Sequence, residues 1–248
     1  MIKYKINPKY QEEFTPFLKN IKEHFSNNNR SIHKARNEIK VLEYKQQEVV
    51  VKSFKVPHLL NRVVYTFFRA SKAKKSYDYA LKINQFVPQP IGYIEFYNNI
   101  LLEKSYFISE HFDYDFTIRE PLLDSNFPQK EQIFKAFAYF TFKLHQEGIL
   151  HNDYSPGNIL IKKLNGQFIF KIVDINRMHF KTLSIEERLK NFAKLWAKDE
   201  DLKIIIKEYA QLIEVDEIFC ITKALYYSQK LKNFKNMKKR LKGKPVVD

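Results

Sequence analysis

The sequence predicts an α+β protein built in two lobes, a small antiparallel β-sheet with one helix followed by a mainly helical part. Short strand-like runs separated by turn residues fill residues 29–112, whereas apolar residues recur at helical spacing from residue 113 to 248. A chain of 248 residues with 44% apolar content is long enough to fill two such cores. We expect residues 1–28 to form an N-terminal extension ahead of these lobes.

The first lobe is expected to contain five strands and one helix. The polar extension predicts one short helix over residues 8–25, to which no function is assigned. Three strands follow as an antiparallel meander within residues 30–55, with turns at Arg36-Asn37 and Gln46-Gln47. Apolar residues at helical spacing predict a helix within residues 56–86, and the last two strands are expected at 91–98 and 104–112.

The second lobe is expected to be mostly helical. Its first helix runs from Pro128, which suits a first helical turn, to Gly148, which suits a C-terminal cap. A hairpin follows, turning at Asn165-Gly166. Ser184 and Glu187 then form a capping box, and a further helix begins after the acidic run 199–201. The last part of the lobe, 218–247, has no acidic residue and predicts a basic amphipathic helix.

Charge and cysteine content limit the classes of function. The 43 Lys and Arg against 28 Asp and Glu give a net charge of +15, which implies an anionic partner: nucleic acid, a phospholipid surface or a phosphorylated molecule. The single cysteine, Cys220, excludes an internal disulfide and is expected to be a buried apolar thiol. The start lacks an apolar signal region and no run reaches the roughly 18 to 20 apolar residues of a membrane span, so we expect a cytoplasmic protein.

The stretch "EGILHNDYSPGNILI", residues 147–161, carries the chemistry. Asp153 and Asn158 lie on one loop, and Asp174 follows the apolar strand "FKIV". Two carboxylates and an amide oxygen suit Mg²⁺, which prefers oxygen ligands. In phosphoryl transfer the protein positions the nucleophile, holds the metal and neutralises phosphate charge. Asp153 is in the right place to meet the hydroxyl of the nucleophile.

These motifs resemble the protein-kinase-like fold over roughly residues 30–220. "HNDYSPGN" looks like its catalytic loop, "VDIN" looks like its metal-binding triplet, and "VVVK" resembles the strand whose lysine, here Lys52, holds the ATP phosphates. The resemblance implies that Asp78 pairs with Lys52 and that Asn158 and Asp174 hold Mg²⁺. It also implies that Asp153 is catalytic and that "ISEHF", with Glu110, is the hinge strand at the nucleotide. A solvent-facing helix acid is the alternative for Asp78, and His151 is expected to brace the loop.

Departures from the family pattern narrow the function. No G-x-G-x-x-G is present, and a tight turn at Ala35, Arg36 and Asn37 is expected to hold the phosphates instead. Asn152 stands where phosphorylation-switched kinases have an arginine, which argues against control by loop phosphorylation. From Asp174 the capping Ser184 is only ten residues further on, too short a stretch for a peptide-docking platform. The acceptor is therefore expected not to be a protein.

Among small-molecule kinases, the sequence is most similar to the bacterial lipopolysaccharide core kinases, the Kdo and heptose kinase family. The resemblance implies ATP- and Mg²⁺-dependent phosphorylation of an inner-core sugar on lipid A, by a peripheral protein at the inner face of the inner membrane. The charge suits an anionic glycolipid acceptor and an anionic membrane surface. Three alternatives remain: a kinase for another small molecule, a pseudokinase scaffold at the membrane, and a nucleic-acid-binding protein. The last leaves the order of the motif residues unexplained, and no nucleic-acid motif is visible.

Overall fold

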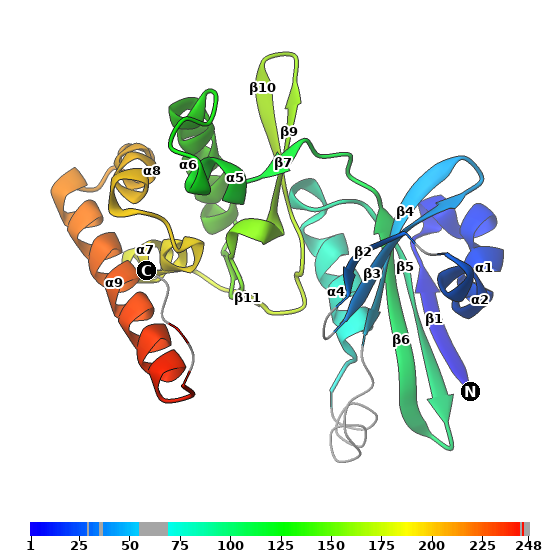
Figure 1. The fold of residues 1–248 in the computed structure, drawn as a ribbon. Coiled ribbons are helices and arrows are strands. Elements are labelled where there is room, and N and C mark those ends of the chain that lie inside the picture. Colours follow the sequence, from blue (N-terminus) through cyan, green and yellow to red (C-terminus); the bar gives the residue numbers. More distant parts are fainter. Residues whose placement is uncertain (29, 35–36, 55–68, 244, 246–248) are drawn as a thin grey trace. The chain divides into compact units, whose positions relative to one another are not determined.

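A six-stranded antiparallel sheet forms the body of the first of two units, Met1–Asp113, in the computed structural model (Figure 1). The structure describes residues 1–28, 30–34, 37–54, 69–243 and 245. The strand order is β1-β5-β6-β4-β3-β2. The bounds are β1 Ile2–Ile6, β2 Ser31–Lys34, β3 Glu38–Tyr44, β4 Gln47–Phe54, β5 Pro90–Asn98 and β6 Leu101–Glu110. The five predicted strands are confirmed, and β1 is an additional strand at the sheet edge.

The prediction of one short helix in residues 1–28 was wrong. After β1 the segment forms the 3₁₀ turn η1 (Pro8–Tyr10) and two helices, α1 (Gln11–Lys19) and α2 (Ile21–Asn27). Their apolar side chains are almost completely buried in one core cluster with residues of the sheet: Phe14, Phe17, Leu18, Ile21 and Phe25. These five positions follow helical spacing, but the many polar residues between them concealed the pattern. The segment is thus packed into the first unit.

The two faces of this sheet are covered by different helices. Val49 and Val51 of β4 belong to the cluster with α1 and α2. Phe54, on the alternate face, packs with Tyr77 of α4 (Lys72–Lys82). Because side chains alternate along a strand, Lys52 lies on the same face as Phe54, the face that α4 covers. Figure 1 shows α4 on the side of the sheet opposite to α1 and α2.

The helix predicted within residues 56–86 is only partly described. Residues 55–68 lie outside the described part of the chain. In the described remainder, α4 begins after Ser71, whose side chain accepts a hydrogen bond from the Lys74 backbone N–H. The 3₁₀ turn η2 (Asn84–Phe86) follows α4. The helical prediction therefore holds for the described half of the segment.

The second unit, Tyr114–Asp248, is mainly helical, as predicted. Its helices are α5 (Arg119–Leu123), α6 (Lys130–Gln146), α7 (Ile185–Phe192), α8 (Asp199–Leu212) and α9 (Glu217–Arg240), with the 3₁₀ turns η3 (Pro156–Asn158) and η4 (Ala193–Leu195). Strands β7 (Phe116–Thr117), β9 (Ile159–Leu164) and β10 (Gln167–Ile172) form a small sheet in the order β10-β9-β7. β8 (Ile149–His151) pairs with β11 (Met178–Phe180).

Local signals in this unit predicted several of its boundaries. The hairpin of β9 and β10 turns at Asn165 and Gly166, both with positive φ, and the capping box of Ser184 with Glu187 is present. The predicted start of α6 at Pro128 was wrong by two residues, because Gln129 has a left-handed φ of 58° and the helix begins after it. Cys220 is buried, as predicted.

Candidate active site

The candidate active site in the second unit begins at the glycine that ends α6. Gly148 has a φ of +68°, and a Cβ added there would lie 2.6 Å from the Lys181 backbone oxygen. Only glycine therefore lets the chain turn this closely against the segment that follows β11. The turn directs the chain into β8, which pairs with β11 so that His151 lies opposite Met178. The loop 152–158 starts from this fixed strand.

Three hydrogen bonds connect this loop region to the segment after β10. The Asn152 backbone N–H donates to the Arg177 backbone oxygen (3.0 Å), and the Val173 backbone N–H donates to the Asn158 backbone oxygen (2.9 Å). His151 Nε2 lies 2.9 Å from the Val173 backbone oxygen. The structure thus brings together the two segments that carry the three predicted oxygen ligands.

Asn158 is oriented by a hydrogen bond across the loop. Its Nδ2 donates to the Asp153 backbone oxygen at 2.9 Å, which fixes the side-chain amide. Because the amide nitrogen is engaged with the loop, its Oδ1 remains as an acceptor that suits a hard cation. Both Asp153 and Asn158 are partly exposed, so solvent and ligands reach them.

Asp174 follows β10 in the left-handed region, with a φ of 57°. Aspartate and asparagine tolerate this conformation better than most side chains, so the backbone here is compatible with an acid. Asn176 Nδ2 donates to Asp174 Oδ1 at 2.6 Å and orients the carboxylate. Among the described residues, no three His, Cys, Asp or Glu side chains gather as a metal site. Asn158 and Asp174 fit an ion that takes its other ligands from phosphates and water.

His151 braces the loop, as predicted. Its Nδ1 accepts a hydrogen bond from the Asp153 backbone N–H at 3.0 Å. The ring proton is therefore on Nε2, which donates to the Val173 backbone oxygen. Burial lowers the pKa of His151, while its backbone hydrogen bond and the nearby Asp174 and Asp153 oppose the shift. The ring is neutral at physiological pH and acts in packing and orientation.

A buried network that sequence reasoning missed extends from α8 to this loop. Asn191 of α7 donates from Nδ2 to the His151 backbone oxygen (3.0 Å), so its Oδ1 faces His145 Nε2 of α6 at 3.2 Å. Nε2 must then carry the proton, and Nδ1 accepts from the Tyr209 hydroxyl of α8 at 2.7 Å. All four residues are at most 5% exposed. The sequence did contain a signal for this network: a histidine or asparagine on the apolar face of a predicted helix. Such a residue would be buried, and buried polar groups need hydrogen-bond partners.

The network predicts acid sensitivity of the second unit. Burial lowers the pKa of His145 from 6.5 to about 4. Between these values the unfolded chain binds the proton and the folded chain does not, so stability is full above pH 6.5 and falls as the pH decreases towards 4. Linkage gives a loss of about 2 kcal/mol between pH 7.5 and pH 5.

The measurement is urea unfolding at pH 7.5 and pH 5, followed by the fluorescence of Trp196, the single tryptophan, which lies in the second unit. His145→Gln should reduce the difference between the two pH values by that amount. An identical difference in the wild type and the variant would show that His145 does not titrate in this way.

Lys52 and Asp78 lie in the first unit. Lys52 is 9% exposed, and its register partners are Ile39 on β3 and Phe107 on β6. Asp78 forms an ion pair with Lys74, one turn earlier on α4, with 2.6 Å between Oδ2 and Nζ. This hydrogen bond raises the pKa of Lys74. Lys52 shares a sheet face with α4, and its pairing with Asp78 stays a prediction.

The other predicted nucleotide contacts are also in the first unit. Glu110 ends β6, and its Oε1 accepts a hydrogen bond from the Tyr10 hydroxyl at 2.5 Å. The carboxylate thus attaches the N-terminal segment to the end of this strand, and burial together with Glu110 raises the pKa of Tyr10. Asn37 is a partly exposed residue just before β3, whereas Arg36 lies outside the described residues. A nucleotide role for these three residues stays a prediction.

The second unit carries most of the likeness to a known protein family. The model of the lipopolysaccharide kinase (Kdo/WaaP) family matches residues 87–215. That span includes the loop, Asp174 and the buried network.

Two solved structures are similar to the chain. One is WaaP in complex with acyl carrier protein, with a TM-score of 0.60 and 13% sequence identity over 92% of this chain and 99% of that one. The other is the complex of the Rio2 kinase from Chaetomium thermophilum with ADP, Mg²⁺ and phosphoaspartate, with a TM-score of 0.48 and 16% identity over 84% of this chain and 67% of that one. The likeness to WaaP shows a shared fold and confirms the predicted protein-kinase-like fold class.

Proposed function

Since the chain belongs to the lipopolysaccharide kinase (Kdo/WaaP) family, we propose that it transfers the γ-phosphoryl group of ATP to a sugar hydroxyl of the lipopolysaccharide inner core. Membership makes the chain a kinase. The acceptor that we propose is Kdo or heptose attached to lipid A. The observation that carries the proposal is the hydrogen bonding between the loop with Asp153 and Asn158 and the segment with Asp174.

The proposed roles follow from the chemistry of the side chains. Asn158 and Asp174 would hold Mg²⁺, which neutralises charge on the nucleotide phosphates when bound. Lys52 adds a positive charge for the same phosphates. Asp153 orients the acceptor hydroxyl and takes its proton as the new O–P bond forms, while the bond from the γ-phosphorus to the bridging oxygen breaks and ADP leaves.

The remaining predicted residues belong to nucleotide binding in this proposal. Asp78 would orient Lys52, and the turn with Arg36 and Asn37 would hold phosphates in place of a glycine-rich loop. Glu110 would contribute by fixing the end of β6, since its carboxylate is engaged with Tyr10.

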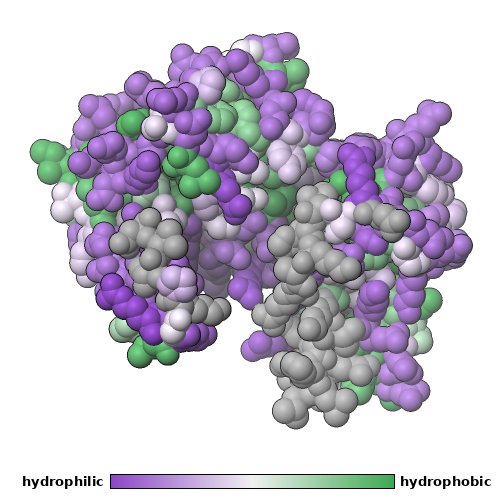
Figure 2. All heavy atoms as spheres, in the orientation of Figure 1, coloured by the Kyte–Doolittle hydropathy of each residue, from purple (hydrophilic) through white to green (hydrophobic). Residues whose placement is uncertain are grey.

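Charge supports an anionic acceptor. The chain carries a net charge of +15, and hydrophilic residues cover most of the face in Figure 2. A basic field raises the local concentration of an anionic glycolipid and speeds its association. A cationic acceptor would instead require acidic residues around its binding site. This argument favours the lipopolysaccharide core over aminoglycoside or choline as acceptor.

We also propose that the end of α9 contacts an anionic membrane surface. No helix in the described ranges is both long and apolar enough to cross a bilayer. The first half of α9 buries Cys220, Ala224 and Ser228, but its last turns expose an apolar group at one-face spacing: Phe234 (46%), Met237 (50%) and Leu241 (79%). Five cations surround this group: Lys235, Lys238, Lys239, Arg240 and Lys242. The combination is typical of helices that lie in a membrane interface.

Removing the exposed apolar group should weaken membrane binding. The triple change Phe234→Ser, Met237→Ser and Leu241→Ser is expected to lower partitioning onto vesicles containing phosphatidylglycerol at least tenfold, since each buried apolar side chain contributes about 1.5 kcal/mol or more. Vesicle sedimentation at constant salt measures this. Ile218→Ser is the matched control, because Ile218 is 75% exposed at the acidic start of the same helix. Equal partitioning of the triple variant and the wild type would remove the membrane contact from the proposal.

An ATP-consumption assay with extracted lipid A that carries its inner-core sugars tests the function. We expect ATP consumption that depends on Mg²⁺ and on the sugars, with the phosphate found on the glycolipid. ATP consumption without phosphate on the glycolipid would indicate a kinase for another small molecule. Absence of both turnover and an ATP-dependent shift in melting temperature would support a pseudokinase scaffold.

A further inference from the structure

An arginine from a different element lies directly against the candidate catalytic loop. Arg119, the first residue of α5, approaches Gly157 so closely that a Cβ added to the glycine would lie 2.9 Å from its Nη2 and 3.5 Å from its Cζ. The three heavy atoms nearest to that position all belong to this guanidinium. Gly157 therefore makes room for a positive charge one residue before Asn158.

The backbone fixes this approach. Strand β7 pairs with β9 so that Thr117 lies opposite Leu160, and the Ile118 N–H donates to the Ile159 oxygen at 3.0 Å. These bonds hold the start of α5 beside the end of the loop. The pairing of β7 with β9 thus positions Arg119 beside Gly157.

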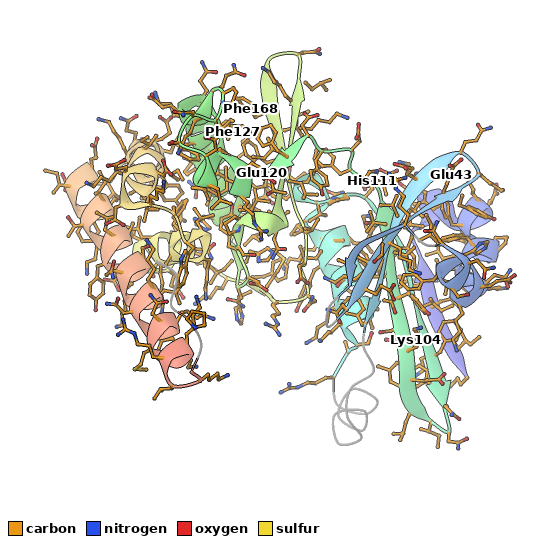
Figure 3. All side chains as sticks on the ribbon, in the orientation of Figure 1. Glu43, Lys104, His111, Glu120, Phe127 and Phe168 are labelled. Carbon is orange, nitrogen blue, oxygen red and sulfur yellow. The ribbon has the colours of Figure 1, made fainter. Side chains whose placement is uncertain are left out.

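Arg119 is exposed and makes no side-chain hydrogen bond or ion pair within the described part of the chain. The adjacent Glu120, labelled in Figure 3, forms no ion pair with Arg119 in the described part of the chain. Its Oε2 accepts instead from the Thr117 hydroxyl (2.6 Å) and backbone N–H (2.9 Å). Some exposed cations of this unit do have carboxylate partners, as Lys135 does with Glu131. Arg119 keeps its charge available to a ligand.

A second exposed arginine lies at the other end of the loop. The Arg177 backbone oxygen accepts from the Asn152 N–H at 3.0 Å, so Arg177 is attached to the loop one residue before Asp153. Its guanidinium also has no carboxylate partner among the residues that the structure describes. Two arginines without carboxylate partners in the described residues are therefore attached at the two ends of the segment that carries Asp153, Arg119 through its guanidinium beside Gly157 and Arg177 through its backbone.

We propose that Arg119 and Arg177 bind the anionic group of the acceptor, a carboxylate or phosphate next to the hydroxyl that reacts. The proposal rests on the proposed function, because it places the acceptor at Asp153. Guanidinium groups form paired, charge-assisted hydrogen bonds with both kinds of anion, and such bonds orient as well as attract. An acidic sugar held from both ends of the loop would present its hydroxyl to Asp153. The same chemistry could serve a nucleotide phosphate, and the test separates the two sources.

The test measures binding and turnover in Arg119→Ala, Arg177→Ala and Gly157→Ala. Each should weaken binding of detergent-solubilised lipid A with its inner-core sugars about tenfold or more, as expected for a lost charge-assisted hydrogen bond. KM for this acceptor should rise accordingly. The Mg²⁺-dependent shift in melting temperature with ATP should remain unchanged, since the arginines serve the acceptor.

Gly157→Ala provides the sharpest variant. It retains both arginines but places a methyl group where the Arg119 guanidinium lies, and the flexible side chain can move away without unfolding the loop. The double variant Gly157→Ala, Arg119→Ala should therefore bind no more weakly than Arg119→Ala alone. Additive losses would show that the glycine acts independently of the arginine.

Lys203→Ala is the matched control, because it removes one exposed charge on α8. It should bind the acceptor with the affinity of the wild type. If Arg119→Ala, Arg177→Ala and Lys203→Ala all weakened acceptor binding to the same extent, the effect would be one of general charge and the proposal would be overturned. Acceptor binding unchanged in both arginine variants would also overturn it, as would a lost ATP shift with acceptor binding intact. The binding measurement is decisive even if the wild type does not turn over, an outcome that would count against the proposed function alone.

Discussion

Asp153→Asn is expected to lower turnover at least ~10²-fold, the contribution typical of general acid–base catalysis, while nucleotide binding is retained. The amide has nearly the shape of the carboxylate but cannot accept the hydroxyl proton. The loop should keep its conformation, because the hydrogen bonds that Asp153 makes within it come from its backbone N–H and oxygen. The side chain is thus available for chemistry.

Initial rates with the inner-core glycolipid and the ATP-dependent shift in melting temperature, both with Mg²⁺, measure the two parts of this prediction. Asp124→Asn is a matched control, since in the described part of the chain that exposed carboxylate accepts only a local hydrogen bond from the Asn126 N–H, which an amide oxygen can replace. Wild-type turnover in Asp153→Asn would make the loop structural and refute its catalytic assignment.

Asp174→Asn is expected to act on a different step and to weaken Mg²⁺-dependent ATP binding at least ~10-fold, a loss seen even for residues that only support metal ligands. The change removes one negative charge from the proposed ion site. Folding should survive, because asparagine also tolerates the left-handed φ of 57° at this position.

Calorimetry with ATP in the presence of Mg²⁺ and then of EDTA tests the assignment. The wild type should lose affinity on removal of the metal, whereas the variant should be weak in both conditions. Asn176→Asp provides a further comparison, since it replaces the amide that donates to Asp174 Oδ1 at 2.6 Å with a second acid. Equal Mg²⁺ dependence in Asp174→Asn and the wild type would exclude Asp174 as a ligand.

The sequence alone determined the elements whose signals are local. Alternating apolar residues predicted the strands β2 to β6, and Asn165-Gly166 predicted the hairpin turn. Ser184 with Glu187 predicted the start of α7. The loop with Asp153 and Asn158, followed by Asp174 after an apolar strand, likewise identified the candidate site from the order of these residues along the chain.

Only the tertiary structure decided which distant residues support these elements. Pairing of β1 with β5 brought residues 1–28 into the first unit, and a polar-looking segment gave no local sign of that partner. The contact of Arg119 with Gly157 depends on the pairing of β7 with β9. The buried bonds of His145 join residues 64 and 46 positions away. Such contacts arise from how helices and strands pack, and a pattern within one segment carries no information about the surface against which it will be buried.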